Sequence, residues 1–306
     1  MLGHEFNAHS DWITCVAFSP TNEKTLATAS DDYTVCIWTL SQDGKAATLC
    51  HRLTGHTLHV TSVTWSSDGS FLVSGSLDQK IRKWNVWTGT CELEVSTPDH
   101  VNAVAFSPSS DNKHVASGGD NSYVYVWDVS VGVKVHGPLQ GHKESVSTIV
   151  YSPDGQYILS GSNDKSIIVW DSITGTKLFG PLISHLGFIR SISFHPSGES
   201  FVTCADDKTI IIWNAKTHNP THIPTDENRS SATSAQYSTD GRFMLQVHLD
   251  GMLRVWDMDK DKAIIEPMEH GSFVSTASFS PDGQWLASGD VMGVVKIWKL
   301  RGLNSL

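Results

Sequence analysis

The sequence contains no block of basic residues anywhere along its length. Its 306 residues include 22 Lys and Arg against 32 Asp and Glu, a formal net charge of −10. Generic binding to a nucleic-acid backbone needs a basic surface, and so does attachment to an anionic membrane. The charge balance therefore argues against nucleic acid and membranes as partners.

Long apolar runs are also missing. No stretch approaches the roughly 20 apolar residues of a membrane-spanning helix, and the first ten residues, MLGHEFNAHS, do not place a basic segment before an apolar one. The five Cys are an odd number without a CxxC pair, which favours free thiols in a reducing compartment. We therefore expect an intracellular, cytoplasmic protein and leave the nucleus open.

Motifs that carry chemistry are scarce. The sequence has no GxGxxG, no GxxxxGK[ST] and no GxSxG, so it lacks the usual phosphate loops and the nucleophile elbow of hydrolases. His218 and His222 are a weak candidate for a metal site, because Pro220 between them argues against a helical HxxxH pair. We predict no metal, no cofactor and no enzymatic activity.

Tryptophan, by contrast, is abundant and mostly periodic. The segment SGSNDKSIIVWD at residues 160–171 has six further near-copies, such as SGSLDQKIRKWN at 74–85. The Trp residues of these copies recur every 42 to 46 residues, a period typical of propeller blades. They are Trp38, Trp84, Trp127, Trp170, Trp213, Trp256 and Trp298.

Each unit has the pattern of four short strands rather than of helices. Apolar and polar residues alternate with a period of two, and Gly-containing turns such as SPDG at 152–155 separate the alternating runs. An aromatic residue ends the first strand of every unit, and we expect it to fill the space between neighbouring units. These residues are Phe18, Trp65, Phe106, Tyr151, Phe194, Tyr237 and Phe279.

With these motifs the chain resembles the WD40-repeat family across essentially its whole length. The resemblance implies an all-β, seven-bladed β-propeller with four antiparallel strands per blade. It also implies a buried, hydrogen-bonded tetrad of His, Ser or Thr, Asp and Trp in each blade. Four units carry all members: His9, Thr28, Asp32 and Trp38; His56, Ser74, Asp78 and Trp84; His142, Ser160, Asp164 and Trp170; His185, Thr203, Asp207 and Trp213.

Three units depart from the tetrad pattern. The third has Thr97 at the His position and Asn121 at the Asp position, and the sixth has Asn228 and Gln246 at the His and Ser positions. The seventh has Met292 where Asp is expected. We expect these three blades to be held more by packing than by the hydrogen-bonded network.

The two ends of the sequence indicate how the ring closes. Only eight residues follow Trp298, too few for the link and the outer strand of a last blade. Residues 1–6 precede His9 in the same way as residues 49–53 precede His56. We therefore predict one propeller over residues 1–306, with residues 1–6 as the outer strand of the last blade.

The resemblance further implies a partner surface where the inner strands begin. Two positions that flank the start of each inner strand, and one just before the tetrad Asp, project there. We expect an aromatic arc of Trp12, His59, His100 and Phe273, with acidic and basic residues beside it or facing it, although these side chains could instead pack on their own loops. The candidate binding residues are Trp12, Asp31, His59, His100, Asp120, Phe188, Arg190, Asp206 and Phe273.

The expected function is a non-catalytic platform for a protein or peptide partner. The positions expected at the central channel are Thr, Thr, Asn, Ser, Arg, Thr and Ser without a carboxylate, which argues against hydrolysis by paired acids. Recognition of a small molecule or glycan at the channel mouth is the alternative. The links at 128–142 and 171–185 also resemble WD40 arrays of fungal STAND-type NTPases. The partner, the oligomeric state and any further domains stay open.

Overall fold

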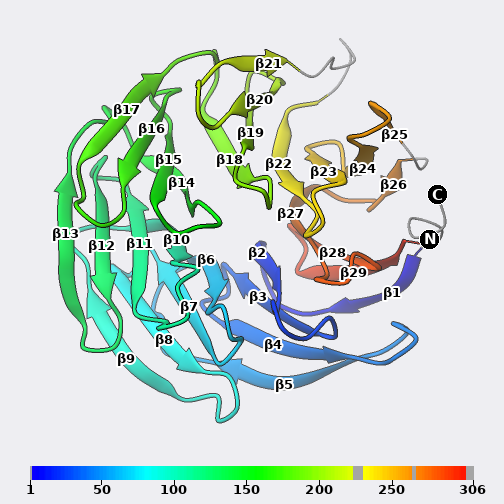
Figure 1. Cartoon of the computed structure of the whole chain (residues 1–306). Coiled ribbons are helices and arrows are strands. Elements are labelled where there is room, and N and C mark those ends of the chain that lie inside the picture. The colour runs from blue at the N-terminus through cyan, green and yellow to red at the C-terminus, as the bar shows by residue number, and fades with distance from the viewer. Residues whose placement is uncertain (1, 223–229, 264–266, 301–306) are drawn as a thin grey trace.

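The computed structural model describes residues 2–222, 230–263 and 267–300. All regular structure in these ranges is β-strand, and it forms seven antiparallel sheets. The sheets are arranged like blades around a central axis (Figure 1). The prediction of an all-β, seven-bladed propeller is confirmed.

Six blades have one strand in each of four concentric layers, and in the sixth blade two short strands share the outer layer. The innermost strands are β2 (Ile13–Phe18), β6 (Val60–Trp65), β10 (Val101–Phe106), β14 (Val146–Tyr151), β18 (Ile189–Phe194), β22 (Ala232–Tyr237) and β27 (Val274–Phe279). The second strands are β3 (Thr25–Ser30), β7 (Phe71–Ser76), β11 (His114–Gly119), β15 (Tyr157–Ser162), β19 (Ser200–Ala205), β23 (Phe243–His248) and β28 (Trp285–Asp290).

The third strands carry the periodic Trp residues, and the outer strands complete the sheets. The third strands are β4 (Val35–Leu40), β8 (Lys80–Asn85), β12 (Val124–Asp128), β16 (Ile167–Asp171), β20 (Ile210–Asn214), β24 (Met252–Asp257) and β29 (Val294–Lys299). The outer strands are β5 (Ala47–Leu53), β9 (Cys91–Ser96), β13 (Val133–Leu139), β17 (Lys177–Leu182), β21 (Pro220–His222), β1 (Leu2–Asn7) and, in the sixth blade, the short β25 (Lys262–Ala263) and β26 (Met268–Glu269).

The turn between the first two strands of a blade is built by its own sequence. In blade four, the hydroxyl of Ser152 donates to the carboxylate of Asp154 (2.5 Å) and accepts the backbone N–H of Tyr157 (2.9 Å). Gly155 has a φ of 73°, a conformation that glycine adopts without strain. The SPDG motif therefore reverses the chain within four residues.

Apolar side chains fill the space between neighbouring blades. One buried cluster joins Val35 and Ile37 of blade one to Val60, Val63 and Trp65 of blade two. The blades approach so closely that a Cβ on Gly161 would lie 2.6 Å from Cγ2 of Ile189 in the next blade. This continuous interblade packing holds the inner ends of the sheets in fixed positions around the axis.

Strands from opposite ends of the sequence close the ring. Strand β1 pairs antiparallel with β29, and the two lie side by side in Figure 1. The pairing extends from Leu2 opposite Trp298 to Asn7 opposite Val294. Closure of the ring by the N-terminal strand is therefore confirmed, with the strand at residues 2–7; residue 1 lies outside the described residues.

Candidate binding surface

The four complete tetrads form one buried network per blade. In blade one, Nε2 of His9 lies 2.7 Å from Oγ1 of Thr28, and its Nδ1 donates to Asp32 at 2.9 Å. The indole N–H of Trp38 donates to the same Oγ1 at 3.1 Å. The equivalent groups of blades two, four and five lie 2.7 to 3.2 Å apart.

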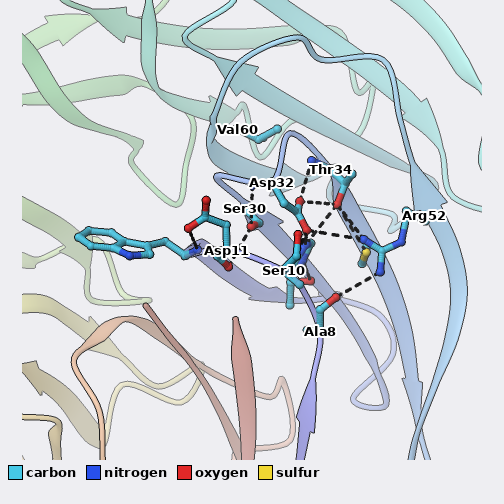
Figure 2. A network of polar contacts seen from close by, with 12 residues as sticks. Ala8, Ser10, Asp11, Ser30, Asp32, Thr34, Arg52 and Val60 are labelled. Atoms are coloured by element: carbon cyan, nitrogen blue, oxygen red, sulfur yellow. Dashed lines mark hydrogen bonds and ion pairs between the residues drawn. The ribbon is translucent and has the colours of Figure 1, made fainter. Parts of the chain in front are cut away.

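Each tetrad also fixes the loop that carries the candidate binding residues. Figure 2 shows Asp32 between Ser10 and Thr34, with Arg52 reaching the same group from the outer strand. The backbone N–H of Ser10 donates to Asp32 at 3.2 Å. The network therefore positions the segment two residues before Trp12, on the face where the inner strands begin, which we call the upper face.

The tetrad carboxylates are held ionised. Burial alone would raise the pKa of Asp32, but hydrogen bonds from His9 and Thr34 lower this pKa well below its usual range. Asp78, Asp164 and Asp207 have lowered pKa values for related reasons. The four tetrad His side chains are at most 1% exposed, so they cannot meet a substrate and act as scaffold.

Blade three keeps only the Trp–Ser part of the network. Trp127 donates to Ser117 at 2.8 Å, whereas the hydroxyl of Thr97 donates to the carbonyl of Asp99. Asn121 donates to the Tyr125 hydroxyl at 3.2 Å. Blade three thus has local hydrogen bonds of Thr97 and Asn121 in place of those to an imidazole, and the Tyr125 ring packs beside Trp127 with ring centroids 5.7 Å apart.

Blade six replaces the network with a different one. His248 lies 3.1 Å from the carbonyl of Ser230 through Nδ1 and 3.5 Å from Oε1 of Gln246 through Nε2. The indole N–H of Trp256 has no acceptor among the described residues. Asn228, expected at the His position, lies outside the described residues.

In blade seven a carboxylate outside the tetrad spacing lies near the tetrad His, although neither ring nitrogen of His270 has a hydrogen-bond partner among the described residues. Asp290, two residues before Met292, lies 3.4 Å from Nδ1 of His270. Its other oxygen accepts the backbone N–H groups of Met292 and Val294 at 2.9 Å each. The spacing rule missed Asp290 because the carboxylate comes from the second-strand end, where blades one, two and four have Ser. An Asp in that Ser position was the available signal.

The backbone brings the upper-face positions together. The N–H of Asp31 donates to the carbonyl of Trp12 at 2.9 Å, and Asp206 donates in the same way to Phe188 at 3.0 Å. The corresponding bond joins Val291 to Phe273 at 3.1 Å. The end of the second strand therefore lies directly beside the start of the inner strand, and the nine candidate residues form four local groups around the channel mouth.

Trp12 and Phe273 form the first group, across the boundary between blades one and seven. Their rings stack with centroids 6.1 Å apart. Trp12 remains 49% exposed, although a side chain packed on its own loop would be covered. The two rings thus offer an apolar platform to solvent.

The second group joins blades one and two. Nδ1 of His59 lies 2.9 Å from Oδ1 of Asp31. The ring of Tyr33 meets His59 edge to face with centroids 5.5 Å apart, and Tyr33 is 40% exposed. Burial raises the pKa of Asp31. Sequence analysis missed Tyr33 because it considered only one position of that turn.

His100 and Asp120 form the third group, in blade three. The carboxylate of Asp120 accepts hydrogen bonds from His100 at 3.0 Å, from Asn102 at 2.8 Å and from Ser145 of blade four at 3.0 Å. Burial opposes ionisation, but these hydrogen bonds hold the pKa of Asp120 below its usual value. Asp120 is therefore a fixed negative charge on the upper face.

Phe188, Arg190 and Asp206 form the fourth group, in blade five. Arg190 binds Asp206 through two hydrogen bonds, from Nε at 2.7 Å and from an Nη atom at 2.5 Å. The guanidinium also lies 5.8 Å from the centre of the Phe188 ring. The hydrogen bonds to Asp206 raise the pKa of Arg190.

The four residues of the predicted aromatic arc do not form one continuous contact. Trp12 stacks on Phe273, whereas His59 and His100 each turn to a carboxylate. Further exposed apolar residues lie in the loops and turns of the upper face. They are Leu249 and, missed by sequence analysis, Leu58, Leu186 and Met292. An apolar residue in the loop after the tetrad His, or in the turn after the second strand, was the sequence feature that could have predicted them.

Below these groups, a ring of hydrogen bonds connects the blades. Thr61 donates to the carbonyl of Val101 at 2.6 Å, and Ser147 donates to that of Ile189 at 2.5 Å. Equivalent bonds start from Thr14, Asn102, Thr233 and Ser275. Arg190 occupies this position in blade five and instead turns to Asp206, so the side chain faces the surface.

Other site types find little support in the described part of the chain. No group of three or more His, Cys, Asp or Glu able to hold a metal occurs there. His218 packs against Phe179, with ring centroids 4.2 Å apart. Within the same ranges, no helix is long and apolar enough to cross a membrane.

Comparison with known proteins adds family matches and relatives. Residues 109–306 match the family described as the IFT122 first beta-propeller, and residues 2–39, 47–85 and 89–128 match the WD domain, G-beta repeat. Cross-pathway control WD-repeat protein 2 of Flammulina velutipes is 28% identical, over 46% of this chain and 59% of its own length.

Two more relatives match shorter stretches. Probable cytosolic iron-sulfur protein assembly protein 1 of Meyerozyma guilliermondii is 33% identical, over 40% of each chain. Small ribosomal subunit protein RACK1 of Brassica napus is 38% identical, over 28% of this chain and 27% of its own. The alignments thus span 27 to 59% of the relatives' lengths. Because seven sheets repeat one blade pattern and a propeller family matches most of the chain, the protein belongs to the WD40-repeat β-propellers, in the family of the IFT122 first beta-propeller.

Proposed function

We propose that this propeller is a non-catalytic platform that binds a protein or peptide partner on its upper face. The observation that carries the proposal is the stacked pair of Trp12 and Phe273, with Trp12 half exposed beside the channel mouth. Aromatic residues and Arg dominate the binding energy of protein interfaces. An exposed aromatic pair on a rigid scaffold is a suitable anchor for a partner.

The charges of the surface favour a basic partner. Asp31, Asp120 and Asp206 all lie beside the aromatic groups, and Arg190 is engaged by Asp206. Complementary charge steers association and selects among partners. We therefore propose a peptide or protein segment that combines an apolar anchor with Lys or Arg.

A small molecule or glycan at the channel mouth is the second candidate. Trp12 could serve as a stacking platform for a sugar ring, since its indole is exposed. The hydroxyls of Thr14, Thr61 and Ser147 are engaged with neighbouring carbonyls. They are therefore poorly placed to bind sugar hydroxyls, and this favours the protein partner.

We place the protein in the cytoplasm. Its five cysteines, all described by the structure, are free thiols, as expected in a reducing compartment. One relative carries the word cytosolic in its name. The net charge of −10 disfavours recognition of nucleic acid or of an anionic membrane surface.

The test is affinity capture from lysate of the source organism with three baits. The wild type is compared with a Trp12→Ala/Phe273→Ala double variant and with Trp87→Ala. Trp87 is 81% exposed and lies in the link between β8 and β9, at the opposite end of the sheet from the upper face, so it is a matched control for the loss of a surface indole.

We expect a protein that the wild type and Trp87→Ala capture and the double variant loses, with circular dichroism showing that all three baits fold. Capture of the same partner by all three baits would contradict the proposed surface. Capture by none, together with thermal stabilisation by sugars that requires Trp12, would support the second candidate instead.

A further inference from the structure

Two equivalent grooves on the other face of the ring differ in whether they are covered. In the groove between blades seven and one, Trp285 at the start of β28 is only 2% exposed. In the groove between blades four and five, Tyr157 has the same place at the start of β15 and is 39% exposed. The two aromatic side chains occupy corresponding positions, but only one of them is buried.

The chain itself supplies the cover for Trp285. The hairpin at residues 41–46, between β4 and β5, folds over the indole so closely that a Cβ on Gly44 would overlap the ring. The ammonium groups of Lys24 and Lys299 lie 4.2 and 4.9 Å from the centre of the ring. A glycine turn and two cations therefore complete this groove.

The groove between blades four and five lacks the hairpin. In blade one, Trp38 pairs with Leu49, eleven residues further along the chain, whereas in blade five Trp213 pairs with Pro220, only seven residues further along. The link of blade five is too short to reach over Tyr157 as the hairpin reaches over Trp285. The aromatic side chain is left open to solvent.

The cations are also replaced, and their replacements are acidic. Trp285 pairs with Lys299 across its sheet, and at the same register Tyr157 pairs with Asp171. Lys24 and Glu199 also occupy equivalent positions. The backbone carbonyl of Lys24 accepts the N–H of Leu40 in blade one, and the backbone carbonyl of Glu199 accepts the N–H of Ala215 in blade five. The two Lys positions around Trp285 thus correspond to two acidic positions near Tyr157, and of these Glu199 lines the groove.

The uncovered groove has the size and lining of a binding site. It encloses about 710 Å³, with Phe194 and Phe201 among its lining residues. Phe179 is 51% exposed at its edge, beside Tyr157 and Leu178. Asp154 and Glu199 also line it, together with Lys216 and the imidazole of His218. The lining combines exposed apolar surface with an excess of negative charge.

We propose that the groove between blades four and five is a second docking site, which takes a β-hairpin turn of a partner protein that carries a glycine and a Lys or Arg. The turn takes the place that residues 41–46 occupy over Trp285. The basic side chain lies over Tyr157 and pairs with Glu199, where the other groove has Lys24. This site is separate from the upper face and does not depend on the function proposed there.

The test uses two disulfide-cyclised hairpin peptides on the whole chain. Both carry the turn Ser-Gln-Asp-Gly-Lys-Ala, and they differ only in the residues that flank this turn, which are Lys in one and Glu in the other. Binding is measured by isothermal titration calorimetry. We expect the Lys peptide to bind the wild type at least about fivefold more tightly than the Glu peptide, as a cation–aromatic contact with a carboxylate partner requires.

The variants locate the contact. Tyr157→Ala and, separately, Glu199→Lys should each weaken binding of the Lys peptide about fivefold or more. His114→Ala, the same position in blade three, and the Trp12→Ala/Phe273→Ala variant should bind it as the wild type does. Equal binding of both peptides, unchanged binding by Tyr157→Ala in a folded variant, or no binding at all would overturn the proposal.

Discussion

Blade four and blade seven are two solutions to the same structural problem. Blade four is one continuous stretch of chain in which His142 contacts Asp164 and Ser160. Blade seven takes its outer strand from the other end of the sequence and its carboxylate from Asp290. Both blades therefore place a carboxylate beside the buried imidazole, but from different sequence positions. Only blade four closes the hydrogen bonds, since neither ring nitrogen of His270 has a hydrogen-bond partner among the described residues.

We expect the largest loss of stability from removal of the outer strand of blade seven. Deletion of residues 2–7 removes β1 and the side chain of Phe6, which packs against Trp38 with ring centroids 4.8 Å apart. Truncation of a fully buried Phe costs about 3–5 kcal/mol, and loss of the half-buried Phe6 should cost part of this, to which loss of the pairing between β1 and β29 adds. Since about 1 kcal/mol shifts the melting temperature of a large domain by about 2–4 °C, we expect a fall of about 10 °C or more in a thermal melt.

A matched deletion shows whether this effect comes from closure. Removal of residues 110 and 111 shortens the turn between β10 and β11 to the length of the equivalent turn in blade four and leaves every strand in place. We expect this variant to melt within a few degrees of the wild type. Equal losses in the two deletions, or an unchanged melt without β1, would contradict the role of β1 in closing the ring.

Asp290 is the next point of comparison. Asp290→Ala leaves the buried His270 without its carboxylate, which should lower the free energy of unfolding by about 1–3 kcal/mol. Adding Met292→Asp restores a carboxylate at the position that it has in blade four. We expect the double variant to regain at least half of the loss in urea unfolding. A double variant as unstable as Asp290→Ala would show that the two positions are not equivalent.

The features that could be predicted are those repeated along the sequence. The spacing of the Trp residues predicted the blades, and the short tail after Trp298 predicted closure by the N-terminal strand. The contact of Trp12 with Phe273 was expected once the ring placed blades seven and one side by side. These features follow from a regular pattern, so a single rule applies to every copy.

The features that could not be predicted depend on where one blade departs from the rule. Asp290 was missed because the rule fixed the carboxylate at the position of Met292. The open groove beside Tyr157 was missed because its exposure depends on the length of a link in the next blade. Local sequence does not carry such information, since the cover of a groove is a tertiary contact.

The dependence of stability on acidic pH tests the carboxylates of all four blades with complete tetrads. The folded-state pKa of Asp164 lies below the unfolded value of about 3.9, because hydrogen bonds from His142 and Ser166 outweigh the effect of burial. Its contribution is therefore fully present above about pH 4 and is lost as the pH falls through the folded pKa. We expect urea midpoints of the wild type to fall steeply between about pH 4 and 2.

Asp164→Asn is the variant that isolates this contribution. It should be less stable than the wild type at pH 6, and its urea midpoint should fall less steeply below pH 4. Asp250→Asn, in blade six, is the control, since the described residues place no imidazole against that carboxylate. Parallel pH profiles for the wild type and Asp164→Asn would contradict the assigned role of the carboxylate.

We expect the smallest effect on stability from removal of the indole N–H, and this effect should differ between blade four and blade six. The N–H of Trp170 donates to Ser160 at 2.8 Å, whereas that of Trp256 has no acceptor among the described residues. Replacement by benzothienylalanine keeps the shape of the ring and removes only the N–H. It should lower the free energy of unfolding by about 1 kcal/mol at Trp170 and leave it unchanged or slightly higher at Trp256, because a buried, unpaired donor is itself destabilising. Equal losses at both positions in urea unfolding would mean that blade six satisfies its indole after all and that the two networks are energetically alike.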